Sequence, residues 1–533
     1  MPRKASSPVP VIDLFAGPGG LAEGFSSVLD AKGKKRKFEI RLSIEMDAYA
    51  HRTLSLRAFF RQFDPGKAPD EYYAYLRGEI AGEKLRSDPK FSKQWTEVEE
   101  EARCLELGVD NVTSIIGERL SGAKEWVLIG GPPCQAYSLV GRSRMTGAGE
   151  QREGESDRAY RQRVAQKKED FEQDHRHQLY REYLKIIADH RPTMFVMENV
   201  KGILSSKQNG ERIFPLIRSD LEKPLKALGK RGEELGYTIH SFVAPPQGLF
   251  ANDFEDSDFL IRAEEHGIPQ ARHRVILLGV RHDVSIDSIP LLEKSTKQMS
   301  LKEALAGLPR LISGLSKGGE ETAHEALQQF RNSEAWNELL FSGQSSALLD
   351  RMERHIQKAG KRLKRSGDGK QLRVAPDYAA TPGEKERLVV CNHETRSHIR
   401  EDLWRYFFAA CFAEEHGRSP KLEDFPKSLL PKHRNVDQAI AGKKFADRFR
   451  VQLPDSPSTT VVSHISKDGH YYIHPDPRQY RSLTVREAAR LQTFPDNYYF
   501  EGPRTQQFHQ VGNAVPPLLA RQVAEVVSAV LKR

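Results

Sequence analysis

A strand-like run that changes at once into a glycine-rich turn is the feature that most constrains the fold. Five of the six residues in 11–16 are apolar, which is typical of a buried strand. Three glycines follow, Gly17, Gly19 and Gly20, before a helical segment that starts at Leu21. Glycines at this position let the backbone approach a ligand held at the helix N-terminus. The loop lacks the GxGxxG spacing of dinucleotide-binding proteins, so on its own it predicts a strand–loop–helix unit and leaves the ligand open.

The alternation of apolar runs and helical segments continues to about residue 280. We predict further strands at 38–44, 109–116, 127–129, 194–197, 237–244 and 275–280, and helices at 176–190 and 213–235. Strands that alternate with helices form a mostly parallel, doubly wound sheet, and such sheets bind ligands at the carboxyl ends of their strands. The sequence therefore predicts an α/β fold with a site where these runs end.

Two of the predicted strands end in an acidic residue. Glu45 follows the strand 38–44, at the distance from the glycine loop where a carboxylate binds ribose hydroxyls. A solvated strand end is an equally good interpretation of Glu45. Glu198 follows the run 194–197, where a carboxylate is costly to bury unless it has a function.

A single cysteine, Cys134, comes just after the strand 127–129. The intervening Gly-Gly-Pro-Pro sequence ends the strand sharply and fixes the backbone before the thiol. This placement suits a nucleophile at the rim of a crevice, and the alternative is a small buried thiol, the commonest state of a free cysteine. The glycine- and arginine-containing segment after Ser138 has few apolar anchors, which predicts a mobile lid.

Charge and composition are compatible with a polyanionic partner. The net charge is +9, although a solvated basic surface would give the same value. The sequence has no run of about 18 apolar residues and no apolar stretch that could act as a signal peptide, so we expect no membrane association. The four cysteines lie far apart, which favours a reducing, cytoplasmic compartment.

The regular alternation is lost between residues 282 and 480. Nine residues within 351–373 are Lys or Arg, a density that suits phosphate contacts or, alternatively, a flexible solvated linker. The spacing of Cys391, His393, His398 and Cys411 matches no standard ligand set, so we predict no metal site.

Two further segments lie outside this pattern. Residues 60–105 are predicted to form a charged, helical insertion without an assigned role. Order returns at residue 481, where Thr484 and Glu487 predict a capping box at the start of a short helix, and a last helix is predicted at 518–531.

Six motifs occur together in one order. They are Asp13-Leu-Phe-Ala-Gly-Pro-Gly-Gly, Gly131-Pro-Pro-Cys-Gln, Glu198-Asn-Val, Gln270-Ala-Arg-His-Arg, Arg486-Glu-Ala-Ala-Arg-Leu-Gln-Thr-Phe-Pro and Gln510-Val-Gly-Asn-Ala-Val-Pro-Pro. In this order they resemble the DNA (cytosine-5) methyltransferases, the S-adenosylmethionine-dependent enzymes of bacterial modification systems. The resemblance covers residues 11–280 and 481–533.

The resemblance implies a domain organisation and a reaction. Residues 1–280 would form the catalytic domain that binds S-adenosylmethionine, 281–480 a target-recognition domain with a DNA-contacting basic segment, and 481–533 a segment that returns to the catalytic domain and packs beside the glycine loop. The enzyme would methylate carbon 5 of cytosine in double-stranded DNA, within a restriction-modification or phage-defence system. A bacterial, nucleoid-associated location and a cognate restriction or defence component follow from the same resemblance.

The resemblance also implies residue roles. The catalytic group would be Cys134, which adds to the cytosine ring, Glu198, which bonds the base, and Arg272 and Arg274, which orient them. Contacts to DNA or to the flipped base would come from Gln135, Ser138, Arg142, Arg144 and Gln270. The implied S-adenosylmethionine contacts are Asp13, Phe15, Ala16, Gly17, Gly19, Gly20, Leu21, Glu45, Met46, Asn111, Pro132, Leu179, Asn513 and Val515. Asn111 is a preferred match only, because the chain reads Asp110-Asn111-Val112 where relatives commonly have Asp-Ile.

Two other interpretations remain open at this point. An RNA methyltransferase of the same fold would have a small recognition region, and residues 282–480 are long for that class. A binding-only protein would not be expected to keep Cys134, Glu198, Arg272 and Arg274 together.

Overall fold

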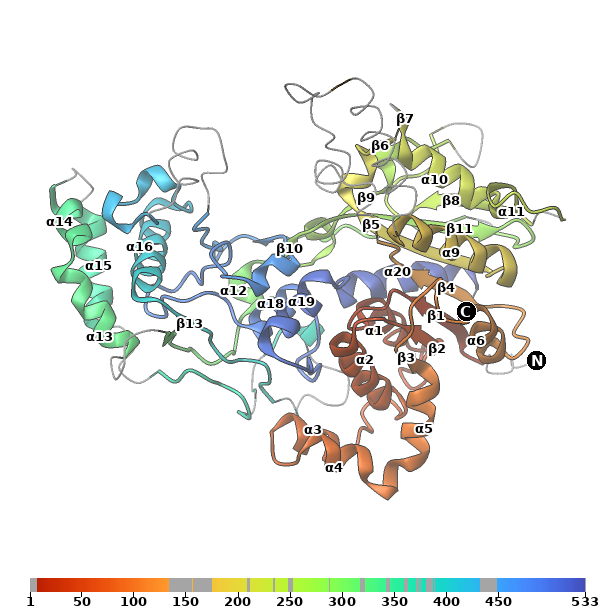
Figure 1. Ribbon diagram of the computed structural model, residues 1–533, viewed down its shortest axis with the longest axis horizontal. Coiled ribbons are helices and arrows are strands. Elements are labelled where there is room, and N and C mark those ends of the chain that lie inside the picture. The colour runs from red at the N-terminus through yellow and green to blue at the C-terminus, as the bar shows by residue number, and fades with distance from the viewer. Residues whose placement is uncertain are drawn as a thin grey trace.

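The chain folds around one large sheet with a separate helical lobe beside it (Figure 1). The computed structural model describes residues 7–133, 156, 175–208, 211–232, 235–247, 253–286, 288–316, 322–341, 346–358, 363–370, 372, 375–379, 387, 389–431 and 448–532. No helix among these residues is long and apolar enough to cross a membrane.

The central sheet has eight strands in the order β3-β2-β1-β4-β5-β11-β8, with β9 paired to β11. Their bounds are β1 Val9–Leu14, β2 Phe38–Ile44, β3 Ala102–Arg103, β4 Val127–Gly130, β5 Met194–Val200, β8 Tyr237–Ser241, β9 Leu260–Arg262 and β11 His273–Arg281. The pairs from β3 to β5 are parallel, and β11 is antiparallel to each of its neighbours. This confirms the expected doubly wound, mostly parallel sheet. The strand order reverses between β1 and β4, which is the position where such sheets bind ligands.

Helices cover both faces of the sheet. Successive β1 residues point to opposite faces, so they pack against different helices. Ile12 and Leu14 belong to a core shared with α6 (Val112–Leu120), α9 (His175–His190) and α10 (Ile213–Glu222). Val9 and Val11 belong to a second core shared with α1 (Gly20–Ser26) and α20 (Pro517–Val530). The short helix α11 (Pro224–Ala227) lies next to α9 and α10. The strand expected at 109–116 was wrong, since Val112, Ile115 and Ile116 belong to α6 and β3 is only two residues long.

The last helix packs tightly against the first one. A Cβ atom added at Gly24 of α1 would lie 2.3 Å from Ala520 Cβ of α20, so only glycine allows this approach. The C-terminal segment therefore returns to the glycine loop, as the resemblance implied.

The insertion at 60–105 forms its own small core next to α2 (Ala48–Arg61). It contains α3 (Asp70–Leu76), α4 (Gly82–Ser87) and α5 (Ser92–Glu101), which project below the sheet in Figure 1. Tyr72 and Tyr73 are buried here with Phe59 and Phe91, so these rings act as core residues and not as a free surface.

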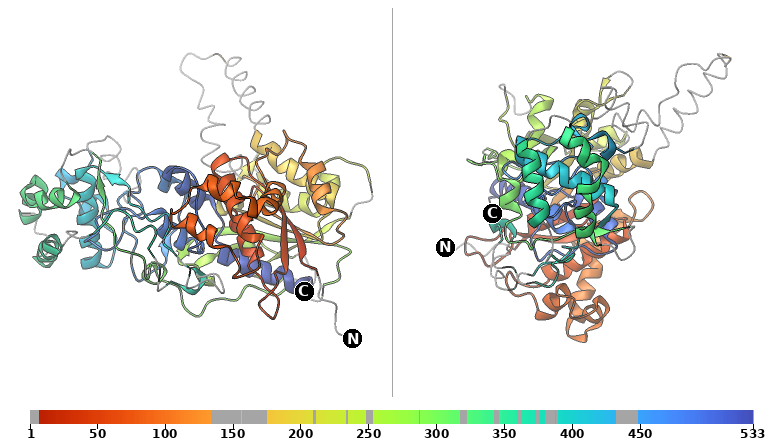
Figure 2. Two further views of the ribbon diagram at one scale, coloured as in Figure 1. Left: turned by 90° about the horizontal axis from the view of Figure 1, so that it is seen from below. Right: turned by 90° about the vertical axis from the view of Figure 1, so that its left-hand side faces the viewer.

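A helical lobe lies at the opposite end of the molecule from the sheet in Figure 1 and in the left view of Figure 2. Its helices are α13 (Ala323–Gln328), α14 (Glu334–Phe341), α15 (Ser346–Lys358) and α16 (Arg400–His416). The aromatic helix α16 contributes more residues than any other helix to this lobe's core, so its rings pack internally.

Three helices lie between this lobe and the sheet: α12 (Leu301–Ala304), α18 (Val485–Leu491) and α19 (Arg504–Asn513). The capping box of Thr484 and Glu487 at the start of α18 is confirmed. Short strand pairs complete the described fold: β6 (Lys207–Gln208) with β7 (Glu211–Arg212), β10 (Gln270–Ala271) with β14 (Ser458–Thr459), and β12 (Gly314–Leu315) with β13 (Ser397–His398).

Candidate active site

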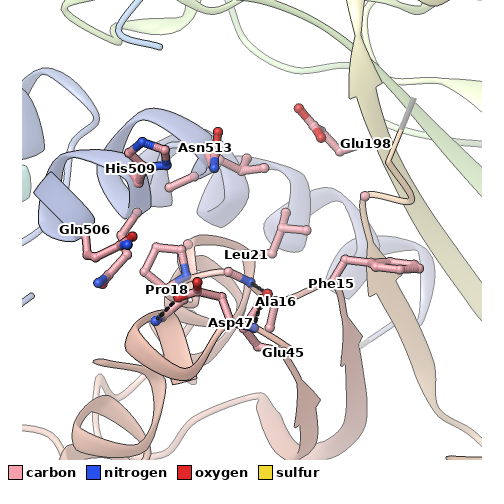
Figure 3. Close-up of a pocket in the computed structure, with 17 residues that line it drawn as sticks. Phe15, Ala16, Pro18, Leu21, Glu45, Asp47, Glu198, Gln506, His509 and Asn513 are labelled. Carbon is pink, nitrogen blue, oxygen red and sulfur yellow. Dashed lines mark hydrogen bonds between the residues drawn. The ribbon is translucent and has the colours of Figure 1, made fainter. Parts of the chain in front are cut away.

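A cavity of about 270 Å³ opens at the carboxyl ends of β1 and β4, where the strand order reverses. Glu198 lies at one end of it, Gln506 and His509 lie at the other, and Asn513 lies between them (Figure 3). The lining residues are Phe15, Ala16, Gly17, Pro18, Gly20, Leu21, Glu45, Asp47, Ala50, Gly131, Glu198, Gln506, His509, Gln510, Asn513, Ala514 and Val515.

The glycine loop forms the floor of the cavity because its backbone adopts conformations that few side chains allow. Gly17 has a φ of +56° and Gly19 a φ of +96°. A Cβ atom at Gly20 would lie 2.2 Å from the carbonyl oxygen of Val515, so the start of α1 is pressed against the start of α20. The Tyr498 hydroxyl donates a hydrogen bond to the carbonyl of Pro18 and holds the loop from behind.

Glu45 fixes the loop from the end of β2. The Gly17 amide donates to Glu45 Oε2 at 2.7 Å, and the Asp47 amide donates to Oε1 at 2.8 Å. Burial raises the pKa of Glu45, and these two amide bonds oppose that effect. The carboxylate keeps lone pairs for further donors, and it lines the cavity. It is therefore placed to accept hydrogen bonds from the hydroxyls of a sugar.

One face of α19 forms the opposite wall. Gln506 lies three and four residues before His509 and Gln510, and Asn513 lies four and three residues after them, so the four side chains share one side of the helix. Of these four residues, only Asn513 was predicted from the sequence. The spacing of the four polar residues was the signal that could have found the others.

Glu198 and Arg274 form an ion pair at the end of the cavity. Arg274 Nε lies 2.8 Å from Glu198 Oε1, and the two side chains are 12% and 14% exposed. The contact follows from the antiparallel pairing of β5 with β11, which places Arg274 opposite Val200. A Cβ atom at Gly131 would lie 2.9 Å from Glu198 Oε2, so the residue after β4 must be small to admit this carboxylate.

The backbone just before Cys134 is held by the same strand end. Asn199 Nδ2 donates to the carbonyl of Pro132 at 3.1 Å, which ties the end of β5 to the Gly-Pro-Pro turn after β4. Five predicted site residues lie outside the described residues: Cys134, Gln135, Ser138, Arg142 and Arg144.

Arg272 has different partners from Arg274. Its guanidinium donates to the carbonyls of Val461 at 2.7 Å and Ala514 at 2.8 Å, and burial lowers its pKa well below the ordinary value. Arg272 therefore joins the start of β11 to the end of α19, while the hydrogen-bonded contact with Glu198 is made by Arg274.

Gln270 is held by hydrogen bonds inside the protein. Its side chain is fully buried, and the expected contact with DNA stays a prediction. Its amide donates to the carbonyl of Leu491 and to Gln492 Oε1, both at 3.1 Å, and its oxygen accepts the Val461 amide at 2.6 Å. These internal bonds leave Gln270 a structural role.

Six of the expected cofactor residues do not line the cavity, and their contacts with the cofactor stay a prediction. Asp13 is fully buried in β1, and its carboxyl pKa is raised well above the ordinary value by burial. Leu179 is packed in the core beneath the sheet. The other four have different surroundings. The Cβ position of Gly19 faces Leu54 and Tyr498, and Met46 is 57% exposed. Asn111 caps α6, and the carbonyl of Pro132 accepts the bond from Asn199.

The basic segment is only partly available for phosphates. Arg351 pairs with Glu414 at 3.0 Å and with Glu415 at 2.8 Å, so this arginine holds α15 to α16.

The residues weighed for a metal site, Cys391, His393, His398 and Cys411, have other surroundings. His393 Nδ1 lies 2.8 Å from Thr484 Oγ1, and burial raises the pKa of Cys391 to about 11. Within the described ranges, no three His, Cys, Asp or Glu side chains are placed to hold a metal ion.

A glycine loop and a half-buried carboxylate at the switch point of a doubly wound sheet form the arrangement in which α/β enzymes hold nucleotide-type cofactors. The family described as C-5 cytosine-specific DNA methylase matches residues 164–529. The chain belongs to this family, whose members methylate carbon 5 of cytosine in DNA.

Individual relatives agree with this assignment, and a solved structure shares the fold. The chain is 31% identical over 546 residues to the type II methyltransferase M.Bpa9945I of Bacillus paralicheniformis, covering 98% of this chain and 99% of the relative. It is 27% identical to the type II methyltransferase M.AgeI of Thalassovita gelatinovora, covering 76% of this chain and 83% of the relative. The crystal structure of a DNA modification methyltransferase encoded within an E. coli prophage shares the fold, with a TM-score of 0.50, 17% identity, and coverage of 98% of this chain and 100% of that one.

Proposed function

We propose that this protein transfers a methyl group from S-adenosylmethionine to carbon 5 of cytosine in double-stranded DNA, through a covalent adduct with Cys134. The observation that carries the proposal is the position of the Glu198–Arg274 pair. It lies at one end of the cavity whose floor is the glycine loop and whose side is Glu45.

The cavity fits S-adenosylmethionine on the chemistry of its donors. Glu45 offers a carboxylate for the ribose hydroxyls, and the space beside the Cβ position of Gly17 is open for a ligand in the loop before α1. Asn513 and His509 supply polar groups for the amino-acid end of the ligand. The bound donor supplies an electrophilic methyl group, which the activated cytosine ring takes at carbon 5.

The protein residues activate the ring. Carbon 5 of cytosine is a poor nucleophile, so the Cys134 thiolate first adds to carbon 6, forming a carbon–sulfur bond. Glu198 bonds the N3 edge of the base and stabilises the enamine that results. After methylation, loss of the carbon 5 proton breaks the carbon–sulfur bond and restores both the ring and the free cysteine. Arg274 holds the Glu198 carboxyl in place for these steps.

The target base must leave the duplex to reach this site, at a cost of a few kcal/mol. The segment with Arg142 and Arg144 would close over the flipped base. Residues 281–480 would read the DNA sequence, and residues 1–280 together with 481–533 would perform the chemistry. This division is supported by the helical lobe, whose core is separate from the two cores that cover the sheet.

The relatives named as type II methyltransferases support a role as the modification enzyme of a bacterial restriction system. Such an enzyme acts on chromosomal DNA in the cytoplasm, and a cognate nuclease that cuts the same sequence would be its genetic partner. A role in phage defence is one form of this proposal.

The test is base-resolution mapping of 5-methylcytosine in DNA from cells that express the protein, with Cys134→Ser as the control. One short sequence methylated only by the wild type is the expected result. If neither protein methylates the genome, the proposal is overturned. If 5-methylcytosine is found in RNA alone, the substrate is RNA and not DNA.

A further inference from the structure

The helical insertion at 60–105 has no part in the proposed reaction. It nevertheless reaches the segment that leads into α19, the helix that forms one wall of the cavity. The connection runs through Glu501, which lies three residues before α19 begins at Arg504.

The Glu501 carboxylate is held by three donors, two of which come from the insertion. The Tyr75 hydroxyl of α3 donates to Oε1 at 2.6 Å, and Arg86 Nη2 of α4 lies 3.4 Å from the same oxygen. Arg52 Nη2 of α2 binds Oε2 at 3.2 Å. The Glu501 side chain is only 4% exposed. A buried carboxylate depends on such partners, because it is strongly destabilising when left unpaired.

The Tyr75 hydroxyl remains a donor at neutral pH. Burial, and then the neighbouring Glu501 charge, raise the pKa of Tyr75 above its ordinary value. The hydroxyl therefore carries its proton, and the bond to the carboxylate is charge-assisted, which makes it stronger than a bond between neutral groups.

The main chain of Glu501 is part of a closed hydrogen-bonded triangle. Its amide donates to Thr53 Oγ1 at 2.8 Å, and its carbonyl accepts from Gln510 Nε2 at 2.9 Å. The Thr53 hydroxyl donates to Gln510 Oε1 at 2.6 Å, which completes the triangle. Both ends of the Gln510 amide are thus committed to groups whose position depends on Glu501.

This triangle lies directly behind the cavity. Gln510 lines the cavity itself, together with His509 and Asn513 on the same face of α19. Thr53 is one helical turn from Ala50, which lines the cavity from α2. A shift of Glu501 would therefore move two walls of the cavity at once.

We infer that the helical insertion is a positioning element of the methyl-donor site, in which Tyr75 and Arg86 hold Glu501 and thereby set the distance between the cavity walls formed by α2 and α19. The inference rests on the proposed function, since it assigns the cavity to S-adenosylmethionine. It gives the insertion a part in donor binding without direct contact to the donor.

The test compares two substitutions that each remove one tyrosine hydroxyl. Tyr75→Phe breaks the bond to Glu501. Tyr237→Phe is the matched control, because its hydroxyl donates to the carbonyl of Pro192 at 2.9 Å at the edge strand β8, away from the cavity. For the full-length wild type and both variants, the measurements are the S-adenosylmethionine Kd by calorimetry, the KM values for donor and DNA, kcat, and Tm.

Tyr75→Phe is expected to raise the Kd and KM for S-adenosylmethionine by about three- to tenfold, and to leave kcat and the KM for DNA within about twofold. Tyr237→Phe should lower Tm without changing the donor Kd. In a Glu501→Gln background the Tyr75→Phe substitution should have little further effect on donor binding, because both act through one carboxylate.

Two outcomes would overturn the inference: a donor Kd in Tyr75→Phe equal to that of the wild type, or the same loss of donor affinity in Tyr237→Phe. A wild-type protein that binds no S-adenosylmethionine would instead refute the proposed function, so the two failures are distinguishable.

Discussion

The contact between α1 and α20 gives the sharpest test of the packing, because one chemical change should have opposite signs at two glycines. Gly24 lies inside α1 against α20, and Gly117 lies inside α6 with open space beside it. Replacing a glycine in a helix by alanine stabilises the helix by about 1 kcal/mol when nothing obstructs the new methyl group. At Gly117 the nearest atom to the added Cβ, His190 Cε1, is 3.8 Å away, which is an ordinary contact.

At Gly24 the same methyl group meets atoms that cannot rotate away. Its Cβ would lie 2.3 Å from Ala520 Cβ and 2.5 Å from the backbone nitrogen of Arg521. Carbon atoms pack at roughly 3.5–4.0 Å, so α20 would have to retreat by more than 1 Å. Overpacking of this kind typically costs about 1–3 kcal/mol. We therefore expect Gly24→Ala to destabilise the sheet region by about 2 kcal/mol, and Gly117→Ala to stabilise it by up to about 1 kcal/mol.

The assay is scanning calorimetry with and without S-adenosylhomocysteine. A protein with several cores need not unfold in one step, and the transition that the ligand raises identifies the unit that contains the cavity. Its Tm should fall by roughly 4 °C in Gly24→Ala and rise slightly in Gly117→Ala. Equal Tm values for the two variants would refute the close approach of α1 and α20 on which this reasoning depends.

Three further predictions concern the cavity and the strand behind it. Arg274→Ala should lower kcat/KM by about 10²–10³-fold with an unchanged donor Kd, because Glu198 loses its partner; equal losses in donor binding and turnover would contradict this role. Glu45→Gln should raise the S-adenosylmethionine Kd by about tenfold or more, measured by calorimetry, since a hydrogen bond to a charged group is lost. The Asp13→Asn variant should become more stable relative to the wild type as pH rises. Burial raises the carboxyl pKa of Asp13. The stability that the protonated carboxyl contributes to the wild type is therefore lost as pH rises through that pKa. Urea midpoints at pH 5 and pH 8 would measure this, and a gain confined to pH 5 would refute it.

Much of the sheet was predictable from sequence because its strands are buried on both faces. Such strands appear as continuous apolar runs, and the polar residue that ends each run marks the edge where ligands bind. This is how Glu45 and Glu198 were found. The error at 109–116 has the same origin, since a short apolar run with β-branched residues does not distinguish a strand from a buried helix. Val112, Ile116 and Leu120 have the helical spacing that the structure confirms.

The hydrogen-bond partners of the other site residues could not be predicted because they are distant in the sequence. Gln270 and Arg272 are two residues apart, but their bonds go to residues 461, 491, 492 and 514. The wall formed by α19 was missed for another reason. Its lining residues are polar, so the helix has no apolar stripe for periodicity to detect.

The packing of α20 against α1 also determines when this protein can complete its fold. The ribosome makes Gly20 495 residues before Val515, yet their backbones are in contact in the finished molecule. Until α20 emerges, one face of β1 and the inner side of α1 lack their cover. Contacts between such distant positions form slowly, and uncovered apolar faces favour aggregation meanwhile. A message cut short before α20 should therefore yield an insoluble, inactive polypeptide and not a partly active methylase.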